Sequence, residues 1–215
     1  MASYADFWGE VGDVEWSPDG RTLAIGSWDA TLHIYDVLTD QGSKIYEYDR
    51  NPGFVHAISG SYDGHYLACA GDDLTVFEKM GNRWSVRQYY RGQVGLLFTV
   101  KWSPTDYRLA ARWNGTVRVW DALTGEQLQS YGGHSEEIHG LTWSPDGRWI
   151  ASADGEKTVQ IWDVRTGAHH FTYPGYEFAY GGYETFQNAV AWSSDGSRIA
   201  SMGKLATIEI WQATE

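Results

Sequence analysis

A short motif recurs five times along the chain, and this recurrence constrains the fold more than any other feature of the sequence. Residues 14–20 read Val-Glu-Trp-Ser-Pro-Asp-Gly, and related copies stand at 58–64, 100–104, 141–147 and 190–196. The residues at the tryptophan position lie 44, 42, 41 and 49 residues apart, and they are Trp16, Gly60, Trp102, Trp143 and Trp192. A period of roughly 20–50 residues is typical of proteins that stack copies of one supersecondary unit. The sequence therefore predicts five structural repeats.

Each repeat has the residue pattern of short β-strands joined by tight turns. In the fourth copy, an apolar run at 150–152 is followed by the alternating segment 158–163. Alternation at period two, rich in Val, Ile, Thr and aromatic residues, is typical of half-buried strands. The Pro-Asp-Gly and Asn-Gly sequences supply hairpin turns. We expect an all-β fold without helices, in which antiparallel four-stranded units bury their apolar faces against one another.

The repeat length, the Trp-Asp endings at 120–121 and 162–163 and the pair Gly133-His134 together resemble the WD40-repeat β-propeller family. The resemblance covers essentially the whole chain. It implies a five-bladed WD40-like β-propeller with four antiparallel strands per blade, formed by residues 1–215 as a single domain. Family members most often have seven blades, so the alternative is that these repeats are a fragment of a larger propeller.

The two ends of the chain favour a complete ring. The last repeat ends directly after its third predicted strand, and the aromatic segment 3–8 precedes the first anchor. We expect residues 1–9 to form a closing strand that completes the last blade, because WD40 proteins commonly close in this way and closure removes exposed sheet edges. A closed ring also predicts a monomer.

The resemblance assigns structural roles to several polar and aromatic residues. In the family, a histidine of a Gly-His pair, a turn acid, a strand hydroxyl and a strand tryptophan form a buried hydrogen-bonded group. The fourth repeat matches this pattern best, with Glu156 where the family prefers Asp. Two further tryptophans occupy the third-strand position of other repeats. The predicted structural residues are His134, Ser152, Glu156, Trp162, Trp120 and Trp211.

Charge and composition exclude several classes of protein. The 16 basic and 28 acidic residues give a net charge of −12, whereas nucleic-acid binding needs clustered Lys and Arg. No apolar run is long enough to span a bilayer, and the first six residues have no signal-peptide character. The single cysteine, Cys69, excludes an internal disulfide framework. We therefore expect a cytoplasmic protein that binds neither nucleic acid nor membrane.

Catalytic and metal-binding patterns do not stand out. His169 and His170 are adjacent on a predicted strand, so their rings should point to opposite faces. The Asp-Gly pairs occur once per repeat, whereas a calcium loop needs several carboxylates within about a dozen residues. Neither a Gly-x-Ser-x-Gly motif nor a phosphate-binding or dinucleotide-binding motif is present. The sequence predicts no enzymatic activity, no metal and no cofactor.

The remaining aromatic residues indicate where a partner would bind. Trp28 and Trp113 fall in the predicted turns between second and third strands, and the resemblance implies that these turns lie on the same face as the connections between blades. The longest connection precedes the last blade and is rich in tyrosine and glycine, residues that recognition surfaces use. Alternatively, this insertion plugs the mouth of the ring or forms a disordered tip. The predicted partner-binding residues are Trp28, Asp29, Trp113, Tyr176, Phe178, Tyr180 and Tyr183.

These observations predict a non-catalytic interaction module or scaffold that binds a protein or peptide segment on the propeller face. The acidic net charge favours a basic partner segment. The main alternative is a sensor or regulatory propeller domain of a larger bacterial signalling protein. Two further alternatives are small-molecule or glycan binding at the aromatic insertion and a designed propeller, although irregular repeats argue against the latter.

Overall fold

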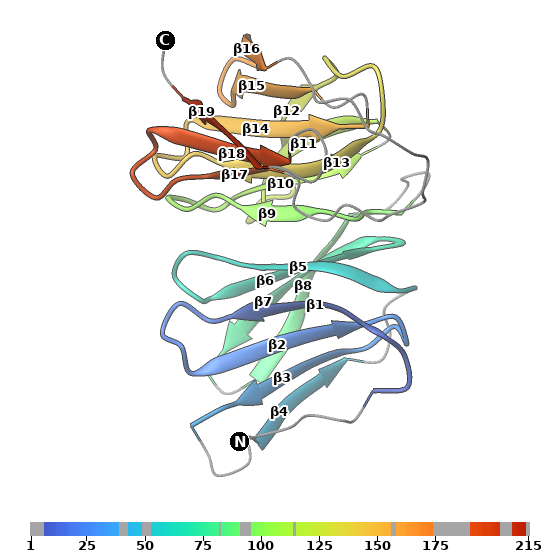
Figure 1. Cartoon of the computed structure of the whole chain (residues 1–215). Helices are drawn as coiled ribbons and strands as arrows, with labels where there is room; N and C mark the ends of the chain where they lie inside the picture. Colours follow the sequence, from blue (N-terminus) through green and yellow to red (C-terminus); the bar gives the residue numbers. More distant parts are fainter. Residues whose placement is uncertain are drawn as a thin grey trace. The chain divides into compact units, whose positions relative to one another are not determined.

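The computed structural model describes residues 7–38, 43–48, 53–81, 83–90, 96–113, 115–155, 158–173, 190–202 and 208–213. In these ranges the regular secondary structure consists of β-strands connected by turns, and no helix is present (Figure 1). The chain divides into two compact units, Met1–Trp102 and Ser103–Glu215. The β-strands of the described residues confirm the predicted all-β class. Residues 1–6 of the proposed closing strand lie outside the described residues.

The first unit contains the first two repeats and the first strand of the third. Its two sheets are simple meanders in which each strand pairs antiparallel with the next in sequence. The first sheet consists of β1 (Val11–Trp16), β2 (Thr22–Ser27), β3 (Leu32–Asp36) and β4 (Ser43–Tyr48). The second consists of β5 (Val55–Gly60), β6 (Tyr66–Gly71), β7 (Leu74–Met80) and β8 (Arg83–Tyr90), and β9 (Val100–Trp102) follows.

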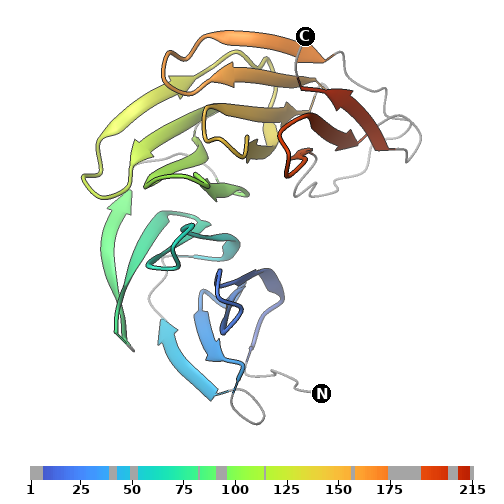
Figure 2. The same cartoon turned by 90° about the vertical axis from the view of Figure 1, so that its left-hand side faces the viewer.

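The second unit continues the same antiparallel pattern. The third repeat contributes β10 (Arg108–Trp113), β11 (Thr116–Asp121) and β12 (Gln127–Tyr131). The fourth contributes β13 (Ile138–Trp143), β14 (Trp149–Asp154), β15 (Val159–Asp163) and β16 (His169–Tyr173), coloured yellow to orange in Figure 2. Among the described residues, the fifth has three strands, which are β17 (Val190–Trp192), β18 (Arg198–Met202) and β19 (Ile208–Gln212).

The recurring Ser-Pro-Asp-Gly motif forms the hairpin turn between the first and second strands of a repeat. In the first repeat, the Ser17 hydroxyl donates to Asp19 Oδ1 at 2.5 Å and accepts the Thr22 amide at 2.9 Å. Gly20 has a φ of +66°, a conformation that glycine adopts without steric cost. The same bonds recur in the fourth repeat, where Ser144 occupies the position of Ser17. The Asp-Gly pairs of these repeats are therefore turn elements.

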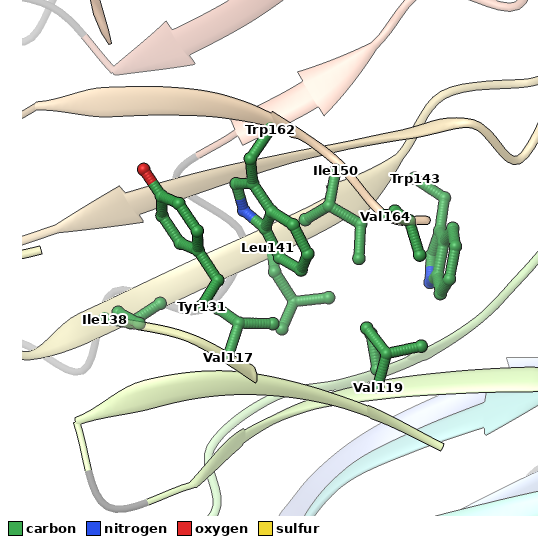
Figure 3. Packing of buried hydrophobic residues seen from close by; sticks show 10 residues of the cluster. Val117, Val119, Tyr131, Ile138, Leu141, Trp143, Ile150, Trp162 and Val164 are labelled. Atoms are coloured by element: carbon green, nitrogen blue, oxygen red, sulfur yellow. The ribbon is translucent and has the colours of Figure 1, made fainter. Parts of the chain in front are cut away.

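The core of each unit lies between successive sheets. In the second unit, valines of β11 pack against large side chains of the fourth repeat (Figure 3). In the first unit, apolar residues of β3 pack in the same way against the second repeat. In the second unit, Val117 and Val119 pack with residues that include Leu141, Ile150 and Trp162. In the first unit, Leu32 and Ile34 pack with residues that include Ile58, Leu67 and Phe77. In both units, therefore, third-strand residues of one repeat pack against the sheet of the next repeat.

Side chains also satisfy the backbone of edge strands in the first unit. Asp13 Oδ2 accepts the Ile58 amide at 2.9 Å, and Glu15 Oε1 accepts the Gly60 amide at 2.9 Å. These bonds join β1 to β5, which belong to different sheets, and they satisfy amides that a strand edge would otherwise leave unpaired. Burial raises the pKa of Glu15, although the Gly60 amide works in the opposite direction.

Candidate functional site

The predicted buried polar group is present in the fourth repeat. His134 lies between a carboxylate and a hydroxyl: its Nδ1 is 2.7 Å from Asp154 Oδ2, and its Nε2 is 2.6 Å from Ser152 Oγ. Trp162 Nε1 donates to the same Ser152 oxygen at 3.3 Å. The side chains of His134 and Asp154 are almost completely buried. Each polar atom of the group has a hydrogen-bond partner. These bonds connect β14, β15 and the segment before β13.

The carboxylate that bonds to His134 is that of Asp154, whereas the sequence pattern named Glu156. Asp154 is the last residue of β14, and it also accepts the Thr158 amide at 2.8 Å and the Thr158 hydroxyl at 2.9 Å. Burial works to raise the pKa of Asp154, but the bonds from His134 and Thr158 outweigh it, so the pKa lies below its usual value. Glu156 itself lies outside the described residues.

The other two predicted structural tryptophans lie on third strands as expected from the pattern. Trp120 is buried in β11. Trp211 in β19 donates from Nε1 to Ser201 Oγ at 3.0 Å, which repeats the bond between Trp162 and Ser152. Both indoles therefore serve as packing groups within the second unit.

Trp113 is buried, and its predicted role as a partner contact stays a prediction. Only 5% of the residue is exposed. Trp113 is the last residue of β10 and pairs with Thr116 of β11. Its ring packs against Trp120 at a centroid distance of 5.4 Å, and the Arg118 guanidinium lies 5.2 Å from its centroid.

The other predicted partner contacts divide into two groups. Tyr176, Phe178, Tyr180 and Tyr183 lie outside the described residues. Trp28 and Asp29 are described, and both lie half-buried in the turn between β2 and β3 of the first unit. The structural account of the candidate site therefore rests on the first unit.

Trp28 belongs to a group of aromatic side chains that sequence reasoning missed. Its ring centroid lies 6.0 Å from that of Phe54 and 5.6 Å from that of His56. His56 in turn lies 4.7 Å from Phe98. We call Trp28, Phe54, His56 and Phe98 the aromatic cluster. It connects the β2–β3 turn, the start of β5 and the segment before β9, so three separate parts of the sequence contribute to it.

Part of the aromatic cluster is accessible to a partner. Phe54 is 49% exposed, and Trp28 and Phe98 are half-buried, whereas His56 is buried. Burial lowers the pKa of His56, although the carboxylate of Asp72 works in the opposite direction. Large aromatic residues with one exposed edge are typical anchors of protein interfaces.

Trp8 stands beside the cluster and is 98% exposed. Its amide donates to Asp29 Oδ2 at 2.8 Å. Asp29 Oδ1 accepts the Thr31 amide at 3.0 Å and the Thr31 hydroxyl at 2.6 Å. Burial works to raise the pKa of Asp29, but these bonds lower it below its usual value. The segment around Trp8 is held further because the Trp28 amide donates to the Glu10 carbonyl at 2.9 Å.

Two acidic residues lie near the cluster. Asp72, whose charge acts on His56, and Glu10, whose carbonyl binds Trp28, are both exposed. Sequence reasoning assigned Trp8 to the closing strand and did not single out Phe54 or Phe98. The only sequence signal for them was their aromatic character next to predicted strand ends.

The described residues show no arrangement suited to metal or thiol chemistry. No group of three or more His, Cys, Asp and Glu side chains in those ranges is placed to hold a metal ion. Cys69 is buried in β6, and burial raises the pKa of its thiol. No helix in the described ranges has the length and apolar character needed to cross a membrane.

Comparison with known proteins gives relatives that contain WD repeats. The chain is 28% identical over 162 residues to transcription initiation factor TFIID subunit 5 of Caenorhabditis elegans, covering 75% of this chain and 24% of that protein. It is 27% identical over 176 residues to WD repeat-containing protein 1 of Rattus norvegicus, covering 80% and 29%. It is 26% identical over 174 residues to Protein HIR1 of Cryptococcus neoformans, covering 68% and 20%.

The chain thus spans less than a third of the length of these relatives. The family pattern described as WD domain, G-beta repeat (WD40) matches residues 5–36, 84–121 and 125–163, which together make up just over half of the chain. These segments include the β2–β3 turn and the His134 group. With its repeated four-stranded sheets, the chain belongs to the WD40 repeat family.

Proposed function

We propose that this chain is a non-catalytic interaction module that binds a basic protein or peptide segment on the aromatic cluster of its first unit. The observation that carries the proposal is the exposure of Trp8 and Phe54 beside the half-buried Trp28. Exposed aromatic residues around a half-buried one offer a partner large contact area at low entropic cost. The insertion with Tyr176 to Tyr183, which lies outside the described residues, stays a second, separate candidate contact.

The family supports a role in protein assembly in general terms. WD40 repeat proteins are generally non-enzymatic scaffolds, and one relative is named as a subunit of a transcription initiation factor. The net charge of −12 and the exposed carboxylates of Glu10 and Asp72 favour a partner with Lys or Arg. We place the protein in the cytoplasm as a monomer.

A selection experiment tests this function. Peptides of 12 residues displayed on phage are selected on the full chain, and the most enriched peptide is synthesised as the probe. We expect it to combine Lys or Arg with an apolar residue, and its affinity to fall as NaCl rises, because exposed charge pairs are screened. Failure to enrich any peptide, or enrichment of acidic peptides whose binding is insensitive to salt, would overturn the proposal.

Two alanine variants locate the binding surface. Phe54 precedes β5 and Tyr62 follows it, and the two are equally accessible at 49% and 46% exposure. Truncating an aromatic anchor costs about 2 kcal/mol or more, so Phe54→Ala should weaken peptide binding about 30-fold. Tyr62→Ala is the matched control and should change it less than about twofold. Equal effects of the two variants would place the binding surface elsewhere.

We also propose that residues 1–215 form one five-bladed propeller, with residues 1–9 supplying the missing strand beside β19. Exposed repeat positions support this proposal. Trp16 is 55% exposed, whereas Trp143 at the same motif position is buried. Ile210 in β19 is exposed, whereas Ile161 at the same position in β15 is buried. Trp16 and Ile210 are thus exposed, although the equivalent Trp143 and Ile161 are buried between sheets in the fourth repeat.

Matched tryptophan variants test ring closure. If the ring is closed, Trp16→Ala should destabilise the protein about as much as Trp143→Ala, which should cost about 3–5 kcal/mol as a core truncation. Urea unfolding measures both changes, and light scattering should give the mass of a monomer. A cost below about 1 kcal/mol for Trp16→Ala, or a dimer in solution, would contradict a closed ring.

A further inference from the structure

We infer that Asp29 is a positioning residue whose two carboxylate oxygens do different work: Oδ1 forms the β2–β3 turn, and Oδ2 holds Trp8 as the anchor of the binding surface. This inference rests on the proposed function and deepens it. It also changes the role of Asp29, which sequence reasoning named as a direct partner contact.

The hydrogen bonds of Asp29 separate the two tasks. Oδ1 accepts both the amide and the hydroxyl of Thr31, two residues later, which is the bonding pattern of an Asx turn. Oδ2 accepts the amide of Trp8, which lies 21 residues earlier in the sequence. Of the bonds that Asp29 accepts, the one from Trp8 connects the turn to the N-terminal segment, which also bonds to Ser27 and Trp28 through the Glu10 carbonyl. Because the carboxylate already binds three donors, it is poorly placed to pair with a partner's cation as well.

The position of Trp8 makes this bond consequential. Almost all of the residue is exposed, so packing contributes little to fixing its side chain. The bond from its amide fixes the backbone of Trp8, and an aromatic residue with a fixed backbone loses less conformational entropy when it binds a partner. Two neighbouring features support the segment after Trp8. Gly9 packs so closely on the Trp28–Asp29 peptide that a Cβ there would clash, and the Glu10 carbonyl accepts the amide of Trp28.

The corresponding turn of the fourth repeat lacks this device. Ser27 and Asp154 occupy the same turn position, because each donates its amide to a carbonyl four residues later, at 3.0 Å and 3.2 Å. There the carboxylate of Asp154 binds the buried His134 rather than a backbone amide beside an exposed indole. Holding Trp8 is therefore a local property of the first repeat.

The substitution Asp29→Asn separates the two tasks of the carboxylate. Asparagine keeps one carbonyl oxygen, which can still accept from Thr31, but its NH₂ group faces the Trp8 amide and cannot accept its hydrogen. Thr31→Val is the matched control, since it removes a hydrogen bond to Oδ1 and leaves the bond from Trp8 intact. Both variants keep the chain length and the charge of every other residue.

Fluorine NMR of protein labelled with 5-fluorotryptophan reads the position of Trp8 directly. Among the 12 tryptophan signals, the one that disappears in Trp8→Phe is that of Trp8. In Asp29→Asn this signal should become sharper, because the released backbone moves more freely, and amide exchange at Trp8 should accelerate about tenfold. In Thr31→Val the line width and the exchange rate should stay the same. An unchanged line width and exchange rate in Asp29→Asn would overturn the inference.

Binding of the selected basic peptide provides the second measurement. Trp8→Ala should weaken it about 30-fold, and Asp29→Asn about three- to tenfold, while Thr31→Val should change it less than about twofold. If Asp29→Asn releases Trp8 but Trp8→Ala binds the peptide normally, the anchor role is overturned. Failure to select any peptide would instead overturn the proposed function, and the NMR result would still decide whether Asp29 holds Trp8.

Discussion

The first and fourth repeats form the same turn between their second and third strands, but they use different side chains around it. In the fourth repeat, the turn begins at Asp154, whose carboxylate is buried against His134. In the first repeat, the equivalent residue is Ser27, and the acid stands two residues later at Asp29. One turn thus directs its carboxylate to an interior histidine and the other to the backbone of an exposed tryptophan.

The first and fourth repeats also differ in the residues that precede their first strands, β1 and β13. Glu137 and Glu10 are equivalent, since their carbonyls accept the amides of Gly155 and Trp28. Three residues before each lie His134 and Phe7, respectively. His134 enters the polar group, whereas Phe7 stacks on His33 with ring centroids 4.7 Å apart. The same position thus holds a histidine of the polar group in the fourth repeat and an aromatic ring stacked on a histidine in the first.

The largest expected effect is on the buried carboxylate. Asp154→Ala leaves His134 and Thr158 without their acceptor in a buried site, so it should destabilise the protein by about 3–5 kcal/mol. Asp29→Ala removes bonds at a half-buried site and should cost about 1–2 kcal/mol. Urea unfolding at pH 7 measures both. Equal costs would mean that the two turns make the same contribution to stability.

Periodicity predicted most of the fold because many strands have an alternating or apolar pattern and many turns contain glycine. The sequence pattern also predicted three members of the polar group, His134, Ser152 and Trp162. It did not identify Asp154, because a motif does not say where β14 ends, and the strand extends through that residue. Asp154 and Glu156 are two residues apart, and a shift of that size changes which side chain of a short loop reaches the histidine.

The candidate surface was harder to predict than the fold. Trp113 stands next to an Asn-Gly turn, as an exposed loop residue would, but hairpin register places it against Trp120. Phe54 and Phe98 are 44 residues apart in sequence, and both join the aromatic cluster through His56. Contacts between separate repeats cannot be deduced from the pattern within one repeat.

An intermediate effect is expected at the hydroxyl shared by histidine and tryptophan. Ser152→Ala leaves His134 Nε2 and Trp162 Nε1 unpaired and should cost about 1–3 kcal/mol. Ser201→Ala is the matched control in the fifth repeat, where Trp211 Nε1 donates to the hydroxyl. It should cost about 0.5–1.5 kcal/mol. A control that costs more than Ser152→Ala would show that the histidine does not strengthen the fourth repeat.

The smallest expected effect is a pH dependence that compares Asp29 with Asp154. The pKa of each lies below its ordinary value of 3.8 in the folded protein, so each carboxylate contributes stability that is complete above pH 3.8 and disappears as pH falls through the folded-state pKa. Asparagine cannot ionise, so the stability difference between wild type and each Asn variant should shrink as the pH is lowered towards 2. The difference at pH 7 should be larger for Asp154→Asn. For Asp29→Asn it should stay below about 1 kcal/mol, because the half-buried carboxylate is screened by water.

Urea midpoints at a series of pH values measure these differences, and Thr31→Val provides a variant that removes a hydrogen bond without removing a charge. A difference for Asp29→Asn that persists unchanged at pH 2 would show that the carboxylate charge does not hold the turn. A difference as large as that for Asp154→Asn would remove the contrast between the two repeats. The predicted outcome follows from their surroundings: the same type of side chain binds a buried histidine in one turn and a backbone amide at the surface in the other.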